Sequence, residues 1–158
     1  MITTAINDTS LPPFLHSIAL SGLARLRLAL GDRAGAQQLF AQAEAGLTTL
    51  HANGENNPFL LDNLILVEAS LGHRDKVNEL AQEAMEKVRN DLWARPGQEE
   101  GIARALVVLG DLDRAFPMLE HVLSVPYAFA LTPALMRIEP DWDCVRNDPR
   151  FQKLVGTK

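Results

Sequence analysis

The chain has a single cysteine, Cys144, among its 158 residues. One thiol cannot form an intramolecular disulfide, and it supplies no second sulfur ligand for a zinc or iron–sulfur site. We expect Cys144 to pack as a small apolar side chain. The length suits one domain whose core needs neither disulfides nor a structural metal.

The chain also lacks an excess of basic residues and a long apolar run. It has 15 Lys and Arg against 20 Asp and Glu, a formal net charge of -5, whereas a nucleic-acid-binding domain normally carries a basic patch. Its apolar runs fall short of the roughly 20 residues that span a bilayer. The first 13 residues lack the basic stretch and apolar core of a secretory signal. We therefore expect a cytoplasmic protein that binds neither nucleic acid nor membrane.

Motifs for catalysis or metal binding are also missing. The letters His73-Arg74-Asp75 match the start of a kinase catalytic loop, but that loop has an asparagine five residues after the aspartate, and Asn78 follows Asp75 by three. The histidines show no i, i+4 pair of the kind that binds metal on a helix; they stand at positions 16, 51, 73 and 121. We expect no catalytic residue, no metal ligand and no cofactor.

A repeated pattern is present instead. Three segments align on a Leu-Gly pair, with glycines at Gly31, Gly72 and Gly110. The fifth residue after each glycine is small: Ala36, Val77 and Ala115. The ninth is bulky in two of the three segments: Phe40, Ala81 and Leu119. The twelfth is apolar in each segment: Ala43, Ala84 and Val122. This is helical spacing. A left-handed glycine ends the helix before it, and Asp32 or Asp111 is expected to cap the helix after it.

This pattern resembles the tetratricopeptide repeat, whose hairpin turn reads Gly-Asp-x-x-x-Ala. In the first hairpin Leu20, Leu23 and Ala24 fill the large, large and small positions of the family's first helix. The chain departs from the family at Ile65, Ala81 and Glu99, and its glycines stand 41 and 38 residues apart, against about 34 in the standard repeat. The resemblance implies an all-α, right-handed solenoid of about three hairpins.

The helix signals predict the following organisation. Residues 1–9 form a flexible N-terminus, hairpins cover 10–51, 57–92 and 97–126, and residues 127–158 form a capping segment. The expected helices run over 10–30, 32–50, 57–71, from 73 to about 92, 98–109 and 111–123. Loops are expected at 52–58 and 94–97. Pro117 inside the sixth helix predicts a late start or a kink, because proline removes an amide donor.

The capping segment contains a second pattern, carried by Arg137, Ile138, Glu139, Pro140, Trp142, Asp143, Arg146, Asp148, Pro149, Arg150, Phe151 and Leu154. This pattern is similar to the end of the tetratricopeptide regions of bacterial regulators that carry a serine/threonine kinase, an adenylate cyclase or a winged-helix domain, and the chain departs from it at Met136, Cys144 and Val145. Thr132-Pro133 and Asp148-Pro149 predict helix starts. Six apolar residues are expected to cover the end of the array: Leu135, Ile138, Trp142, Val145, Phe151 and Leu154. Trp93 is expected, like Trp142, to be a packing anchor rather than a ligand platform.

The family resemblance also nominates a binding groove on the first helices of the hairpins, lined by Ser21, Arg25, Asp62, Leu66, Glu100 and Arg104. We expect a non-enzymatic module that binds a protein or peptide segment. The resemblance of the tail implies a regulatory or scaffolding part of a bacterial signalling protein. The alternative is self-association into a homodimer, and a third reading is an enzyme with an unrecognised site.

Overall fold

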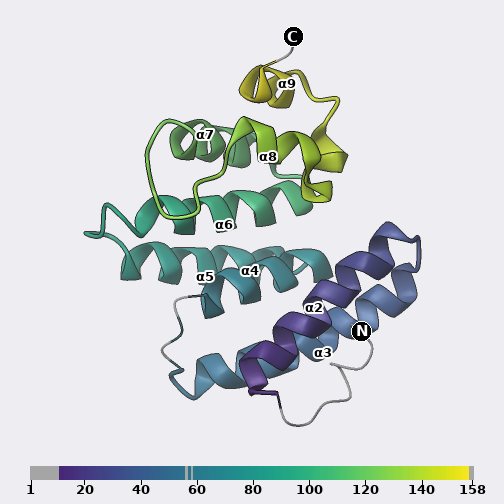
Figure 1. The fold of residues 1–158 in the computed structure, drawn as a ribbon. Coiled ribbons are helices and arrows are strands. Elements are labelled where there is room, and N and C mark those ends of the chain that lie inside the picture. The colour runs from purple at the N-terminus through teal and green to yellow at the C-terminus, as the bar shows by residue number, and fades with distance from the viewer. Residues whose placement is uncertain (1–10, 56, 58, 157–158) are drawn as a thin grey trace. The chain divides into compact units, whose positions relative to one another are not determined.

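The computed structural model describes residues 11–55, 57 and 59–156, and all regular structure within them is helical (Figure 1). The all-α prediction is confirmed. The predicted flexible N-terminus, 1–9, lies outside the described residues. None of the helices found in these ranges combines the length and apolar content that crossing a bilayer requires.

The contacts within the chain divide it into two compact units, the first ending at His73 and the second beginning at Arg74. The first unit contains α2 (Pro13–Ala29), α3 (Arg33–Ala52) and α4 (Leu60–Leu71). The second contains α5 (Arg74–Lys87), α6 (Arg95–Val108), α7 (Leu112–Val122), α8 (Pro133–Ile138), the 3-10 helix η1 (Pro140–Val145) and α9 (Pro149–Val155). The hairpin expected at 57–92 has one helix in each unit, so it stays a prediction.

In the first unit α2 and α3 form a hairpin, and α4 packs against α3 (Figure 1). The buried residues of α3 recur at helical spacing and are at most 3% exposed: Ala36, Phe40, Ala43 and Leu47. They form one apolar stripe. Leu20 and Ala24 of α2 are buried as well, so the sequence pattern predicts this core.

The glycine of each repeated segment adopts the left-handed conformation, with φ of 85° at Gly31, 83° at Gly72 and 73° at Gly110. In all three turns the glycine amide donates to the carbonyl three residues earlier at 3.0 Å, and the next amide donates to the carbonyl five residues earlier at 2.9 Å. These two bonds define a Schellman cap. The predicted glycine caps are confirmed.

The two aspartates that follow these glycines behave differently. Asp32 Oδ1 accepts from the Gly35 amide at 2.9 Å and caps α3 as predicted. Asp111 makes no cap bond, so that prediction is wrong. Its Oδ2 accepts from Arg74 at 3.2 Å and Arg114 at 3.3 Å, because the two guanidinium groups compete with the helix amides for the same carboxylate.

Several predicted helix limits in the second unit are also wrong. α5 ends at Lys87, and α6 begins at Arg95, so residues 94–97 belong mainly to a helix. Pro96 lies in the first turn of α6, where its missing amide costs no helix bond. The turn before it is held by Asp91, whose Oδ1 accepts from the amides of residues 93 and 94.

The sixth predicted helix does not start late. α7 begins at Leu112 and contains Pro117. Pro117 is exposed, and so is Asp113, whose carbonyl loses its helical donor to the proline. Solvent can replace that bond on an exposed side of the helix, which explains why the proline is tolerated.

In the second unit α6 and α7 form a hairpin, α5 and η1 pack against α6, and α9 packs against α7 and α8 (Figure 1). The predicted helix starts are confirmed: Thr132 Oγ1 accepts from the Leu135 amide at 3.2 Å, and Asp148 Oδ1 accepts from the Arg150 amide at 2.8 Å. Trp142 and Phe151, two residues of the predicted core, are buried as well.

Three apolar predictions in this segment are wrong. Leu135 is 38% exposed and Ile138 is 73% exposed, while Met136 between them is fully buried. The Thr132 cap fixes the register of the six-residue helix α8, and in that register Met136 faces the core. Cys144, expected to pack as a small apolar side chain, is exposed.

The two tryptophans offer a matched test of the core of the second unit. Trp142 is fully buried, lies 6.3 Å from the Phe151 ring and donates from Nε1 to Glu139 at 3.1 Å. Trp142→Ala should therefore lower the free energy of unfolding by about 3–5 kcal/mol. Trp93→Ala is the control, because Trp93 is 64% exposed, and its effect should stay within about 0.5 kcal/mol. Urea unfolding followed by circular dichroism measures both, and equal effects would contradict the assigned burial.

Two glycines of the first unit should respond to alanine with opposite signs. A Cβ at Gly72 or Gly22 would meet no atom within 4 Å, so steric clashes with neighbouring residues do not distinguish the two substitutions. Gly72→Ala should destabilise by about 1–2 kcal/mol, because its φ is positive. Gly22→Ala, inside α2, should stabilise by up to about 1 kcal/mol. Thermal unfolding of both variants checks the signs, and stabilisation by Gly72→Ala would rule out the left-handed cap.

Candidate functional site

The six residues nominated for the groove fall into two groups. Ser21 and Arg25 lie on α2 and Asp62 and Leu66 on α4, all in the first unit, whereas the remaining two lie on α6. Ser21 is only 7% exposed, so it offers little to a ligand. Arg25 is exposed, and Asp62 and Leu66 are half-buried. A groove made from all six stays a prediction.

The two residues on α6, Glu100 and Arg104, are joined in an ion-pair cluster within the second unit. Arg104 Nε donates to Glu100 at 2.9 Å, Nη2 to Glu139 at 2.9 Å and Nη1 to Asp141 at 3.1 Å. The guanidinium also lies 4.8 Å from the centre of the Trp142 ring, a cation–π distance. The cluster therefore attaches the C-terminal segment to α6.

Burial and charge act in opposite directions on the pKa of Arg104. Burial lowers it, but the carboxylates of Glu100 and Glu139 raise it, and the net pKa lies above the ordinary value. The side chain is only 18% exposed. Arg104 is thus a charged internal link, and reversing its charge would break these bonds in addition to removing any contact with a partner.

Tyr127 completes the cluster from the loop before α8. Its hydroxyl donates to Glu100 Oε2 at 2.6 Å and accepts from the Leu131 amide at 2.9 Å. Burial, and then the hydrogen bond to Glu100, raise the pKa of Tyr127 well above its ordinary value. Sequence reasoning missed this tyrosine, since its partner lies 27 residues away.

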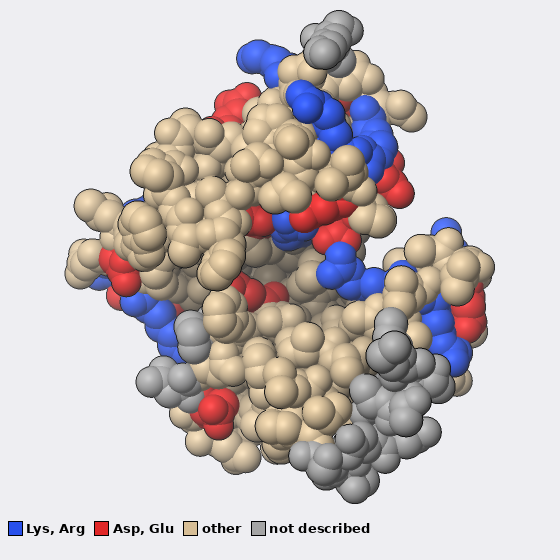
Figure 2. All heavy atoms as spheres, in the orientation of Figure 1, with Lys and Arg blue, Asp and Glu red and all other residues tan. Residues whose placement is uncertain are grey.

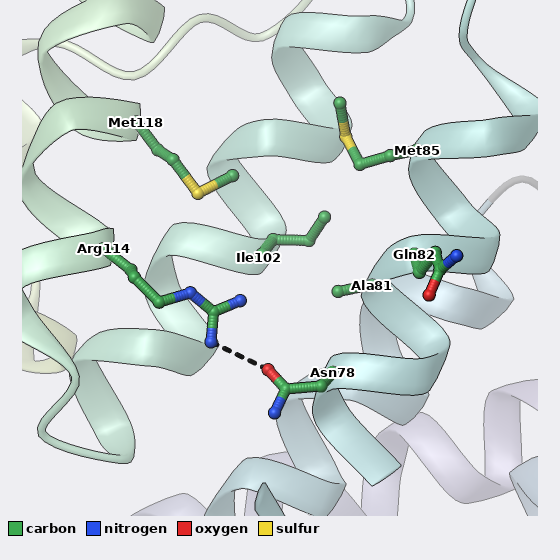
Figure 3. Close-up of a pocket in the computed structure, with 7 residues that line it drawn as sticks. All are labelled: Asn78, Ala81, Gln82, Met85, Ile102, Arg114 and Met118. Atoms are coloured by element: carbon green, nitrogen blue, oxygen red, sulfur yellow. Dashed lines mark hydrogen bonds between the residues drawn. The ribbon is translucent and has the colours of Figure 1, made fainter. Parts of the chain in front are cut away.

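A separate hollow of about 510 Å³ lies among α5, α6 and α7 (Figure 3). Met85 and Met118 stand on opposite sides, with Ile102 and Ala81 between them. Ile102 is 2% exposed and Ala81 is 7% exposed, so they form the floor. The remaining lining residues are Asn78, Gln82 and Arg114.

The hollow exists at a position where the repeated pattern lacks a bulky side chain. Ala81 stands nine residues after its glycine, and the corresponding residues of the other two segments are Phe40 and Leu119. Both of those are buried. Because alanine supplies only one methyl group at this position, Ile102 and the two methionines border open space.

One end of the hollow carries positive charge. Arg114 Nη1 donates to Asn78 Oδ1 at 2.8 Å (Figure 3). The same atom donates to Asp111 Oδ2 at 3.3 Å. Arg74 donates to the same Asp111 oxygen at 3.2 Å and to the Leu109 carbonyl at 3.0 Å. Two guanidinium groups share one carboxylate, so these three side chains sum to one positive charge.

A second hollow, of about 610 Å³, is lined by Leu92, Trp93, Arg95, Pro96, His121, Val125 and Pro126. The prediction that Trp93 is a packing anchor is wrong, because it is 64% exposed and Leu92 beside it is 83% exposed. Near this hollow the buried Glu99 binds Arg95 at 2.9 Å and His121 Nδ1 at 2.5 Å. The contact between Glu99 and His121 holds the start of α6 to the end of α7.

On the face that Figure 2 shows, basic and acidic side chains lie next to each other in several places, and wide uncharged areas lie between those places.

In the ranges that the structure describes, no group of three or more His, Cys, Asp or Glu side chains is placed to hold a metal ion. Comparison of the chain with models of known protein families, with curated proteins and with solved structures found no match.

Sequence reasoning missed the first hollow because it sought a site on the first helices of the hairpins. A signal was present in the second helices. Met85 directly follows the core position Ala84, and Met118 directly precedes the core position Leu119. Each methionine widens the apolar stripe of its helix by one position.

Tyr127 is the one tyrosine of the chain, so tyrosinate absorbance reports its ionisation directly. We expect a titration midpoint above the ordinary value of 10.0 in the folded protein and a return toward that value in urea. As pH rises past 10.0, the unfolded chain releases this proton first, so the stability contributed by Tyr127 is complete below that pH and falls above it.

Tyr127→Phe provides the control, since it should lose this part of the alkaline destabilisation while keeping the part due to lysine and arginine. The difference in unfolding free energy between wild type and variant should therefore shrink above pH 10.0. A folded-state midpoint at or below that value would rule out the buried hydrogen bond to Glu100.

Proposed function

We propose that the chain is a tetratricopeptide-like helical-repeat module that binds a protein segment and is not an enzyme. The observation that carries the repeat is the recurrence of one turn: the three Schellman caps have the same pair of hydrogen bonds. The small residue five positions after each glycine is at most 1% exposed in all three segments: Ala36, Val77 and Ala115. A repeat whose units pack through such faces leaves long surfaces for a partner.

The hollow on α5, α6 and α7 supports the binding role. Its side chains are aliphatic groups, thioethers, amides and one guanidinium. Methionine adapts its shape to different apolar partners and is common at surfaces that bind protein segments. These groups make contacts and hydrogen bonds, and none of the lining residues is a His, Asp, Glu, Lys, Tyr or Cys, the usual acids and bases of catalysis.

The tail supports a regulatory role in a bacterial signalling protein. Residues that carry its resemblance hold the segment together: Arg146 donates to the carbonyls of Arg137 and Glu139, and Arg150 binds Asp148 at 3.0 Å and Asp113 at 2.7 Å. The bond from Arg150 to Asp113 attaches α9 to α7. A repeat module whose C-terminal segment is held in place in this way can serve as a scaffold beside an effector domain.

Photo-crosslinking from two glutamines tests the binding role. A photoreactive amino acid at Gln82 lies in the hollow, whereas the same group at Gln152 lies on α9 of the same unit; both residues are exposed. In cells we expect discrete protein adducts from position 82 and only background from position 152. Mass spectrometry identifies the adducts.

Three other results are informative. Equal adduct patterns at the two positions would contradict a site at the hollow. Adducts that join two copies of this chain at position 82 would favour self-association, the alternative function. The absence of any adduct with intact folding would argue against a protein-binding module.

A further inference from the structure

The apolar part of the hollow fits one or two large side chains. Its volume of about 510 Å³ falls in the range of roughly 300–1,000 Å³ that binding pockets occupy. Ile102 and Ala81 form an apolar floor, and Met85 and Met118 form half-buried walls. A side chain of the size of leucine or phenylalanine would fill the place that Phe40 and Leu119 fill in their own segments.

The polar end selects the charge of the ligand. Both hydrogen bonds of Arg114 use its Nη1 atom, so within the part of the chain that the structure describes the edge formed by Nε and Nη2 has no hydrogen-bond partner. That edge can bind a carboxylate through two parallel hydrogen bonds. The Arg114 side chain is 51% exposed, and Asp111 neutralises only one of the two guanidinium groups beside it. Arg114 is the one charged residue among the described residues that line the hollow.

We propose that this hollow binds a protein segment with a large apolar side chain followed or preceded by an acidic residue. The apolar side chain packs on Ala81 and Ile102 between the two methionines, and the carboxylate binds Arg114. This inference rests on the proposed function and adds the chemistry of its partner. It differs from the groove predicted on the first helices, since the walls belong to α5 and α7.

The structure favours a protein segment over a small molecule because the lining reaches the surface. Gln82 and Arg114 are exposed, and Asn78 is half-buried. Asn78 and Gln82 carry amide groups that both donate and accept, as the backbone of a bound segment requires. The apolar side chain enters the hollow while its backbone stays at the rim.

Two variants remove the two parts of the site. Ala81→Leu fills the hollow with a leucine. The fold should accept it, because the corresponding position of the third segment is already a leucine, Leu119. Arg114→Gln removes the charge of an exposed side chain. Their matched controls in the same unit are Ala134→Leu, on an exposed position of α8, and Arg89→Gln, at a side chain 66% exposed.

The experiment uses a display library of random 12-residue peptides, panned on the full chain. We expect selected peptides to pair Leu, Ile, Phe, Met or Trp with a nearby Asp or Glu. For the strongest peptide, made synthetically, Ala81→Leu should weaken binding at least about tenfold and Arg114→Gln about fivefold. Both control variants should bind like wild type in fluorescence polarisation.

A double-mutant cycle identifies the carboxylate contact. Replacing the acidic residue of the peptide by its amide should weaken binding to wild type about fivefold, and should have little further effect on Arg114→Gln. Additive losses would overturn the assignment of Arg114. Circular dichroism of each variant separates lost binding from lost folding.

The remaining outcomes separate this inference from the function on which it rests. Selected peptides without acidic residues, or peptides that bind Ala81→Leu as tightly as wild type, would overturn the proposed chemistry while leaving a binding module in place. If the library yields no binder and Gln82 gives no adduct, both the inference and the binding function are overturned.

Discussion

The left-handed glycine at the end of a first helix determines which residues of the next helix are buried. Its positive φ and the two Schellman bonds reverse the chain within a few residues. The second helix then starts at a fixed distance from the glycine, so the fifth, ninth and twelfth residues face the first helix. At Gly31 and Gly110 these positions are buried within one unit. A shift of one residue in the turn would rotate each stripe by about 100° and expose it.

The ion-pair cluster at Arg104 plays the corresponding role for the C-terminal segment. The segment contains only short helices, which are weak on their own because helix nucleation is costly. Arg104 joins one carboxylate of α6 to two carboxylates of the segment and lies over the Trp142 ring. Partly buried charges lose hydration, and this loss offsets much of the stability that the ion pairs contribute.

The parts of the fold that follow from neighbouring residues were predictable. Glycine caps, the threonine and aspartate caps of α8 and α9, and the buried stripes all depend on residues within one or two turns. The prediction for Asp111 failed because a distant side chain decides there. Asp111 does not cap α7, because its carboxylate binds Arg74, which stands 37 positions earlier in the sequence. The sequence also could not show that Arg104 binds Glu139 and Asp141, because these partners stand 35 and 37 positions away.

The proposed binding site lies where one segment departs from the regular pattern. A leucine at position 81 would bury apolar surface worth roughly 1.5–3 kcal/mol, and the other two segments have such a residue. The chain forgoes this stability at position 81, and such a departure from a regular pattern is what a binding site at the hollow would require. Arg114 is already held by Asn78 and Asp111, so a ligand would meet an oriented guanidinium. The entropy lost on binding is smaller for a side chain that is fixed beforehand, and this favours a ligand carboxylate at Arg114 over one at a freely moving surface arginine.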